Sequence, residues 1–167
     1  DFRWIGNWRK QLAKGNIPHR LERWIKQQLI AKKQALLFLP NIHLMNKILP
    51  MMQTFHHAIE SVHAEDPKRK EKIENMRGKQ IPILLTTTIL ERGVTIPNID
   101  VAVIGAEDDI FTEAALVQIA GRVGRSVQFP SGEITFFHYG RSKAMVQAKR
   151  HIMNMNREAR RRGLLDE

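Results

Sequence analysis

Two arginines and a glutamine stand at helical spacing in the segment QIAGRVGR. Gln118, Arg122 and Arg125 are four and three residues apart, so a helix would place all three side chains on one face. Two guanidinium groups that converge on one point suit a phosphate chain, and they can stabilise charge on a transferring phosphoryl group. Gly121 and Gly124 would let the backbone approach a bulky ligand. The alternative is a helix end, with arginines on its dipole and glycines as caps.

Hydroxyl groups gather in a second segment, TTTILERGVTIP, which spans residues 86–97 and follows an apolar run. Its three leading threonines leave the end of a predicted strand together, beside exposed backbone N–H groups. Such groups hold a phosphate through several neutral hydrogen bonds. Gly93 allows a tight turn or the close approach of a ligand. The alternative is structural, with β-branched threonines that finish the strand and a glycine that turns the chain.

Five short apolar runs are predicted to be the strands that position these segments. They lie at residues 35–39, 59–62, 83–86, 101–105 and 134–138. The runs are rich in Val, Ile, Leu and Phe and do not alternate with polar residues, which is typical of strands covered on both faces.

Capping residues and apolar periodicity predict helices between these strands. Asn41 caps a helix that ends or restarts at Pro50, because proline removes a helical donor. Asp66 caps the next helix, and Gly78 stops it in a left-handed conformation. Thr112 caps a further helix that runs to about residue 120.

The last helix has an apolar seam with basic residues opposite. The seam comprises Met145, Ala148, Ile152, Met155 and Ala159, opposed by Lys149, Arg150, Arg157 and Arg160. This pattern predicts packing against the core or against a neighbouring domain. Strand–helix alternation along the chain predicts an α/β domain of three layers around a mostly parallel sheet, with a long C-terminal helix. In such sheets, ligands bind in the loops that follow the carboxyl ends of the strands.

The charge distribution favours a polyanionic partner. The 167-residue chain carries 27 Lys and Arg against 17 Asp and Glu, a formal net charge of +10. Residues 1–34 hold nine basic and two acidic side chains, and residues 141–167 hold eight and three. Nucleic acid is the simplest partner for two such flanks, and solvated helix faces are the alternative. The absence of cysteine excludes disulfides and thiolate metal sites, and no apolar run is long enough to span a membrane.

Taken in order, the two segments resemble motifs V and VI of superfamily 2 helicases. ALLFLPNI at residues 35–42 resembles the motif IV strand and loop, and SVHAEDP at residues 61–67 resembles the strand-to-helix turn that follows it. Over nearly the whole chain, from WIGNW at residues 4–8 to HIMNMNREA at residues 151–159, the sequence is similar to the late-competence ComFA family.

The resemblance implies a motor protein. ComFA proteins are implied to be DNA-dependent ATPases, or helicases, that help to drive single-stranded DNA into naturally competent bacteria. Residues 17–167 would be the helicase C-terminal, second RecA-like domain, preceded by a basic N-terminal segment at residues 1–16. The chain has no G-x-x-x-x-G-K-[ST] phosphate loop and no acidic Walker B segment. In the family these lie on the first RecA-like domain, with a four-cysteine zinc site upstream.

The family's cofactors and partners follow as expectations. ATP with Mg²⁺ would bind mainly to the first RecA-like domain, and no cofactor or metal would bind tightly to this chain. Because the sequence opens at Asp1 and not at methionine, we expect it to be part of a longer protein. Because it has neither the phosphate loop nor the Walker B segment, we expect it to hydrolyse no ATP alone. Its partners would be single-stranded DNA, the upstream RecA-like domain and other competence proteins. The location would be the cytoplasm, at the inner face of the membrane beside the DNA-uptake channel.

The resemblance also implies roles for single residues at the nucleotide. Arg122 and Arg125 would face the γ-phosphate, with Gln118 beside them near the attacking water. Gly93 and Thr95 would lie at the nucleotide edge of motif V. Gln118 stands where RNA-directed DEAD-box proteins have a histidine, which favours a DNA-type translocating relative.

A further set of residues would face the nucleic acid. They come from three strand-end loops and comprise Thr86, Thr87, Pro40, Asn41, His63 and Ala64. Thr86 and Thr87 would contact the DNA backbone.

Two other functions remain open at this point. A passive nucleic-acid-binding module would use the basic flanks, with the arginines on phosphate backbone only. A sister motor of the same superfamily, such as a replication-restart or RNA helicase, would share the motifs. A passive binder has no need of a glutamine and two arginines in one register, so the QIAGRVGR face favours the motor.

The remaining candidate side chains have structural interpretations. Trp4, Trp8 and Trp24 are predicted to pin the basic N-terminal segment to the domain, with base stacking as the alternative. His56 and His57 would point about 100° apart on a helix, so no metal site is predicted. The acidic residues 107–109 are predicted to stabilise the dipole of the helix that follows.

Overall fold

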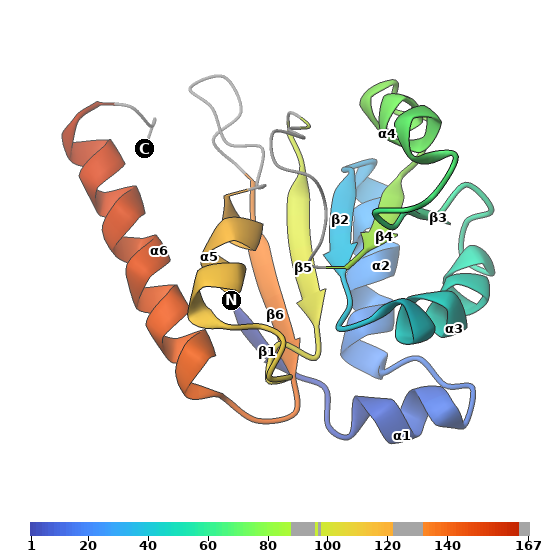
Figure 1. Ribbon diagram of the computed structural model, residues 1–167, viewed down its shortest axis with the longest axis horizontal. Helices are drawn as coiled ribbons and strands as arrows, with labels where there is room; N and C mark the ends of the chain where they lie inside the picture. The colour runs from blue at the N-terminus through green and yellow to red at the C-terminus, as the bar shows by residue number, and fades with distance from the viewer. Residues whose placement is uncertain (88–95, 97, 122–131, 164–167) are drawn as a thin grey trace.

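A six-stranded parallel sheet forms the centre of the computed structural model, which describes residues 1–87, 96, 98–121 and 132–163 (Figure 1). The strands are β1 (Phe2–Trp4), β2 (Ala35–Phe38), β3 (Glu60–Ser61), β4 (Ile83–Thr86), β5 (Asp100–Ile104) and β6 (Ile134–His138). Their order across the sheet is β1-β6-β5-β2-β4-β3, and each neighbouring pair is parallel. The five predicted strands are therefore confirmed, with ends that differ by at most one residue.

Helices cover both faces of the sheet. They are α1 (Trp8–Ala13), α2 (His19–Ala31), α3 (Ile42–Gln53), α4 (Arg69–Arg77), α5 (Glu113–Ala120) and α6 (Lys143–Arg161). On one face, α1, α2 and α3 pack against alternate strand residues such as Leu37 and Leu85. On the other, α4, α5 and α6 pack against the intervening residues, such as Leu36 and Val103. Both sets of strand residues are buried, which explains the continuous apolar runs and confirms the three-layer α/β prediction.

The predicted caps of α3 and α5 are confirmed. The Asn41 side-chain oxygen accepts a hydrogen bond from the Leu44 backbone N–H at 2.9 Å. The Thr112 hydroxyl oxygen accepts one from the Ala115 backbone N–H at 3.1 Å. Each cap satisfies a donor that the first turn of a helix leaves without a partner.

The prediction that a helix ends or restarts at Pro50 is wrong. Helix α3 continues through Pro50 to Gln53. The proline lies in the last turn, so it removes one helical hydrogen bond near an end where few remain. Ile48 and Met52 on either side of it are fully buried, and their packing offsets that loss.

The predicted ends of α4 are also wrong. Asp66 accepts a hydrogen bond from the backbone N–H of Lys68, two residues on, so it forms a local turn and the helix begins only at Arg69. At the other end, Gly78 has a φ of −77° and Lys79, at 62°, adopts the left-handed conformation. The chain thus reverses one residue later than predicted.

Residues 1–16 contribute a strand and a helix that the sequence did not predict. Strand β1 pairs with β6 at the edge of the sheet, where Arg3 stands opposite Phe137. Trp8 and Leu12 of α1 are each 1% exposed and belong to the core. Trp8 therefore anchors the segment to the domain as predicted. Trp24 is buried in α2 against Phe137, and Trp4 is half exposed.

Candidate functional site

Three of the predicted strand-end loops lie side by side at the carboxyl edge of the sheet. The backbone N–H of Leu39, at the end of β2, donates to the carbonyl of Thr86 on β4 at 2.9 Å. The backbone N–H of Val62, after β3, donates to the carbonyl of Leu85 at 2.8 Å. Strand register therefore brings the carboxyl ends of β2, β4 and β3 to one edge, which is where ligands bind in open parallel sheets.

The two threonines at the end of β4 are enclosed. Thr86 is 1% exposed and Thr87 is 6% exposed, and the hydroxyl of Thr86 donates to the carbonyl of Thr87 at 3.5 Å. Pro40, in the neighbouring loop, is buried as well. These three residues form the buried part of the candidate site at the carboxyl edge of the sheet.

Asn41, His63 and Ala64 present a more open surface. Asn41 and Ala64 are exposed and His63 is half-buried. The side-chain oxygen of Asn41 is committed to capping α3, so its amide N–H groups are what it can offer a phosphate. Nδ1 of His63 accepts from the backbone N–H of Glu65 at 3.3 Å, which points its other ring nitrogen away from that contact.

An ion pair holds the loop after β3 in place. Nζ of Lys72 lies 2.7 Å from Oδ2 of Asp66 and donates to the carbonyl of Ser61 at 2.8 Å. The hydrogen bond from Lys72 is the main reason that the pKa of Asp66 lies below its ordinary value. Asp66 is therefore ionised at neutral pH, and the position of His63 and Ala64 depends on this pair.

Of the residues predicted to face the nucleotide, the structure describes Gln118, which lies on α5. Gln118 is exposed in the last turn of α5, whose start is fixed by Thr112. Arg122, Arg125, Gly93 and Thr95 lie outside the described residues.

Glu107, in the loop after β5, is a contact residue that the sequence analysis missed. Nε1 of Trp8 donates to both carboxylate oxygens, at 3.1 and 3.3 Å, and the backbone N–H of Tyr139 donates to Oε1 at 2.7 Å. Arg9 pairs with the neighbouring Asp108 and lies over the Trp8 ring. These contacts correct the interpretation of residues 107–109 as dipole stabilisers only, and no local pattern indicated partners up to 99 positions away.

Gly105 makes that contact possible. It adopts a φ of +72°, and a Cβ on it would lie 2.2 Å from Cζ2 of Trp8. The indole ring therefore occupies the space above the end of β5 that a side chain would need. The loop that leads into α5 is held from one side by Trp8 and from the other by buried Phe111.

His138, at the carboxyl end of β6, is a buried neutral base. It is 5% exposed, and Nδ1 accepts from the backbone N–H of Gly140 at 3.0 Å. Burial lowers the pKa of His138, with the charge of Arg141 as a second cause. The ring is enclosed by Phe2 and Trp4 of β1, both in edge-on contact.

The histidines do not form a metal site in the described part of the chain. His56 and His57 lie after the end of α3 with their rings stacked at 5.1 Å, which corrects the expectation of a helical pair. No group of three or more His, Cys, Asp or Glu side chains among the described residues is arranged to hold a metal ion. Nor does any helix in this part have the length and apolar character needed to cross a bilayer.

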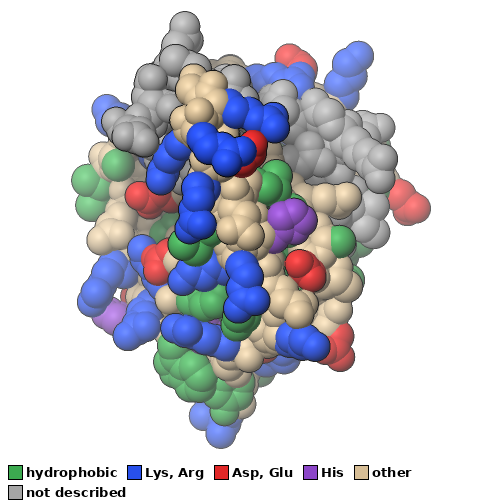
Figure 2. Space-filling model, turned by 90° about the vertical axis from the view of Figure 1, so that its left-hand side faces the viewer, with side chains coloured by type: hydrophobic (Ala, Val, Ile, Leu, Met, Phe, Trp, Pro, Cys, Tyr) green, Lys and Arg blue, Asp and Glu red, His purple; other side chains and the backbone are tan. Residues whose placement is uncertain are grey.

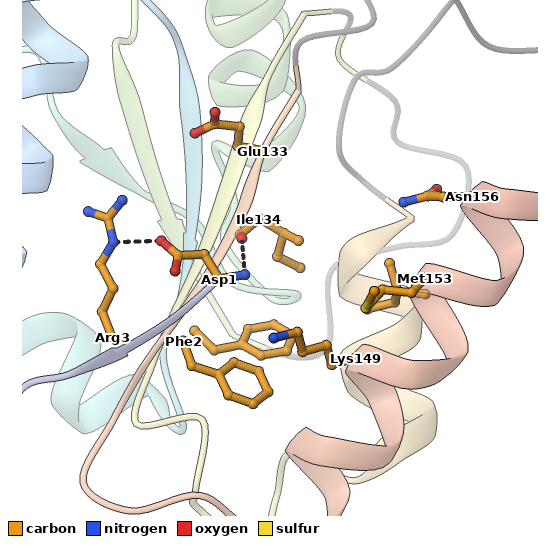
Figure 3. A pocket seen from close by; sticks show the side chains of 10 residues that line it. Asp1, Phe2, Arg3, Glu133, Ile134, Lys149, Met153 and Asn156 are labelled. Carbon is orange, nitrogen blue, oxygen red and sulfur yellow. Dashed lines mark hydrogen bonds and ion pairs between the residues drawn. The ribbon is translucent and has the colours of Figure 1, made fainter. Parts of the chain in front are cut away.

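Two pockets lie toward the opposite edge of the sheet. One, of about 450 Å³, is bounded by β1, the start of β6 and the inner flank of α6 (Figure 3). Another, of about 480 Å³, lies before β2 and β4, beside Gln34 and Pro82. Neither lining includes Thr86, Thr87, Asn41, His63 or Ala64, so these pockets are separate from the candidate site.

Comparison with known sequences gives one family and two curated relatives. Residues 19–127 match the helicase conserved C-terminal domain. The competence protein ComFA of Bacillus subtilis (strain 168) is 45% identical over 155 residues, covering 93% of this chain and 34% of that protein. The ComFA of Streptococcus pneumoniae (strain ATCC BAA-255 / R6) is 34% identical over 158 residues, covering 93% and 37%. The chain thus spans about a third of the length of these relatives.

Solved structures share the fold. Saccharomyces cerevisiae Dbp5 bound to RNA and ADP BeF3 superposes with a TM-score of 0.59 at 17% identity, covering 92% of this chain and 38% of that one. The Escherichia coli DEAD-box protein SrmB, bound to regulator of ribonuclease activity A, gives a TM-score of 0.59 at 15% identity, covering 82% and 75%. At these identities the similarity establishes the architecture alone.

Proposed function

Because this chain belongs to the helicase conserved C-terminal domain family, we propose that it is the second motor domain of an ATP-driven translocase of single-stranded DNA. The observation that carries the proposal is the 45% identity to a ComFA competence protein over 93% of the chain. The biological role would be DNA uptake during natural transformation. The motor would work by closing a cleft between this domain and an upstream RecA-like domain that holds ATP and Mg²⁺.

The nucleotide side of the cleft would be formed by α5 and the segments beside it. Arg122 and Arg125 would bind the γ-phosphate and stabilise charge that develops as the phosphoryl group transfers. Gln118, exposed at the end of α5, would orient the attacking water. Gly93 and Thr95 would line the nucleotide edge.

The DNA side would be the carboxyl edge of β2, β4 and β3. Support comes from the register that places Asn41, His63 and Ala64 on one open surface above Thr86 and Thr87. Amide and backbone N–H donors there would hold phosphates without reading bases, which suits a protein that moves along DNA. The location would be the cytoplasm near the inner membrane face, with other competence proteins as partners.

Arginine substitutions in the longer protein test the nucleotide assignment. Arg122→Ala or Arg125→Ala should lower ATP turnover by about 10³-fold or more, the scale of an arginine finger. Affinity for single-stranded DNA should change little, because these arginines would face the nucleotide. Arg122→Lys should not restore turnover, since an ammonium cannot reproduce the guanidinium fork. Steady-state ATP hydrolysis and fluorescence anisotropy with a labelled oligonucleotide measure the two effects.

One control variant and one variant of the DNA side separate the motor from a passive binder. Arg20→Ala removes an exposed arginine of α2 and should leave turnover unchanged. Thr87→Val removes one hydroxyl, so DNA stimulation should weaken while basal turnover survives; one neutral hydrogen bond is worth about 1 kcal/mol. If Arg122→Ala abolished DNA binding and left ATP turnover intact, the arginines would belong to a nucleic-acid surface and the motor assignment would be wrong.

A further inference from the structure

Helix α6 presents a row of basic residues on the side opposite its packing seam. Met145 and Ala148 are fully buried against α5 and the sheet, which fixes the rotation of the helix. Lys143, Arg150 and Arg157 follow at intervals of seven residues, with Arg161 four residues further on. Seven residues are two helical turns, so these side chains lie on one line that faces away from the seam.

This row is exposed and mostly without acidic partners. All four of its side chains are exposed, and Figure 2 shows Lys and Arg side chains gathered on this side of the molecule. Among the described residues, Arg161 pairs with Glu158 at 2.9 Å, whereas no acidic side chain pairs with Lys143, Arg150 or Arg157.

The inner flank of α6 is different. Lys149 turns toward β1, where Nζ lies 4.9 Å from the centre of the Phe2 ring at the edge of the pocket (Figure 3). Met153 and Asn156 line the same pocket. Lys149 therefore contacts the domain, whereas the four cations of the row face solvent, as does Arg160.

In the N-terminal basic flank, four of the nine cations have acidic partners. Arg3 pairs with Asp1 at 2.8 Å, Arg9 with Asp108, and Lys26 with Glu22 at 3.6 Å. Lys33 lies 3.0 Å from the buried carboxylate of Asp100. The other N-terminal cations are divided between α1, α2 and the residues that end these helices, whereas the row of α6 lies along one face of a single helix.

We propose that the row Lys143, Arg150, Arg157 and Arg161 is a second nucleic-acid surface, which binds the phosphate backbone separately from the strand-end loops. The choice of nucleic acid as the partner rests on the proposed function; the surface itself rests on the geometry of α6. The row begins where β6 ends, at the same edge as the strand-end loops, and runs along the outside of the domain. A DNA strand that leaves the strand-end loops would meet this row of cations.

Its dimensions suit a linear polyanion. Cations two turns apart are about 10.5 Å apart, and the row from Lys143 to Arg161 is about 27 Å long. Gln147 and Asn154 lie along one flank of the row, and exposed Val146 and Met153 lie along the other. A membrane-surface helix needs its apolar stripe for the bilayer, and here Met145 and Ala148 of that stripe are buried in the domain.

The test uses this chain with paired substitutions that remove equal charge. Arg150→Gln/Arg157→Gln removes two cations of the row, and Arg20→Gln/Arg23→Gln removes two exposed cations of α2. Binding of labelled single-stranded and duplex oligonucleotides is measured by anisotropy across about 50 to 200 mM salt. For single strands, the slope of log affinity against log salt should decrease by about 1.4 in the row variant, at about 0.7 per phosphate contact. For duplex the decrease should be about 1.8.

The outcomes distinguish a nucleic-acid surface from a solvated helix face and from a membrane surface. Arg150→Lys/Arg157→Lys keeps the charge and should restore the slope, which would assign the loss in the Gln variant to the two missing charges. Equal slopes in the row and α2 variants would overturn the proposal. So would unchanged DNA binding together with lost binding to phosphatidylserine vesicles, which would make the row a membrane surface. ATP turnover of the longer protein is a separate readout, so failure of the motor assignment would not be mistaken for failure of this one.

Discussion

At the scale of single residues, Trp8 joins the N-terminal segment to the loop after β5 in two ways. Its ring fills the space above Gly105, and its N–H holds Glu107, which also accepts from the backbone of Tyr139. Three segments far apart in the sequence are therefore fixed by one side chain. The loop so fixed leads in a few residues to α5, the helix that carries Gln118.

Gly105→Ala tests this contact. The substitution should destabilise the domain because the new Cβ would lie 2.2 Å from the Trp8 ring, in addition to the strain of a positive φ. Gly15→Ala is the matched control, since Gly15 has a φ of +80° and no atom lies within 4 Å of the added Cβ. We expect the control to lose about 1 to 2 kcal/mol from the left-handed backbone, and Gly105→Ala to lose about 1 to 3 kcal/mol more. Urea unfolding measures both, and equal losses would mean that Trp8 moves aside freely.

At the scale of elements, the start of α3 serves two roles through Asn41. Its side chain caps the helix, and its loop lies at the edge assigned to DNA. A cap contributes to stability wherever the helix stands, whereas a phosphate contact depends on the charge of the side chain. The two roles can therefore be separated by substitution.

Asn41→Ala tests the contribution of the cap to stability, and Asn41→Asp tests the contribution of the loop to DNA binding. The alanine variant should lose about 1 kcal/mol of unfolding free energy with the cap. The aspartate variant keeps an oxygen acceptor and its charge is favourable at a helix N-terminus, so its stability should remain near that of the original chain. Its affinity for single-stranded DNA should fall, because a carboxylate repels phosphate. Undiminished DNA binding by the aspartate variant would remove this loop from the proposed DNA surface.

At the scale of the whole molecule, the described domain supplies one side of a nucleotide cleft in the proposed motor. The sequence contains no phosphate-loop motif, and the relatives are about three times as long as this chain. Catalysis of ATP hydrolysis by a two-domain motor requires groups from both sides of the cleft to converge on one phosphate.

The isolated chain should therefore hydrolyse no ATP above the blank, with or without single-stranded DNA. Phosphate release measured over a range of protein concentrations checks this, with the longer protein as the positive control. DNA-stimulated turnover by residues 1–167 alone would contradict the two-domain mechanism.

Much of the fold and the family follows from local sequence. The sequence predicts the strands at residues 35–38, 83–86 and 134–138 because strands buried on both faces are apolar along their length. The sequence also predicts the helix caps Asn41 and Thr112, because a cap bonds to a backbone N–H only three residues away. The adjacency of the strand-end loops follows in part from the parallel sheet, since carboxyl ends share one edge.

Only the tertiary structure determined the features that depend on residues far apart in the sequence. Strand β1 has only three residues and exists through pairing with β6, and Glu107 is held by a tryptophan 99 positions away. Such contacts produce no periodic pattern in the sequence, because the position of each partner depends on residues far away in the chain. The pairing of charges also depends on the fold. Both flanks are rich in basic residues, but folding brings acidic side chains to Arg9 and Lys33 and leaves Arg150 and Arg157 facing solvent.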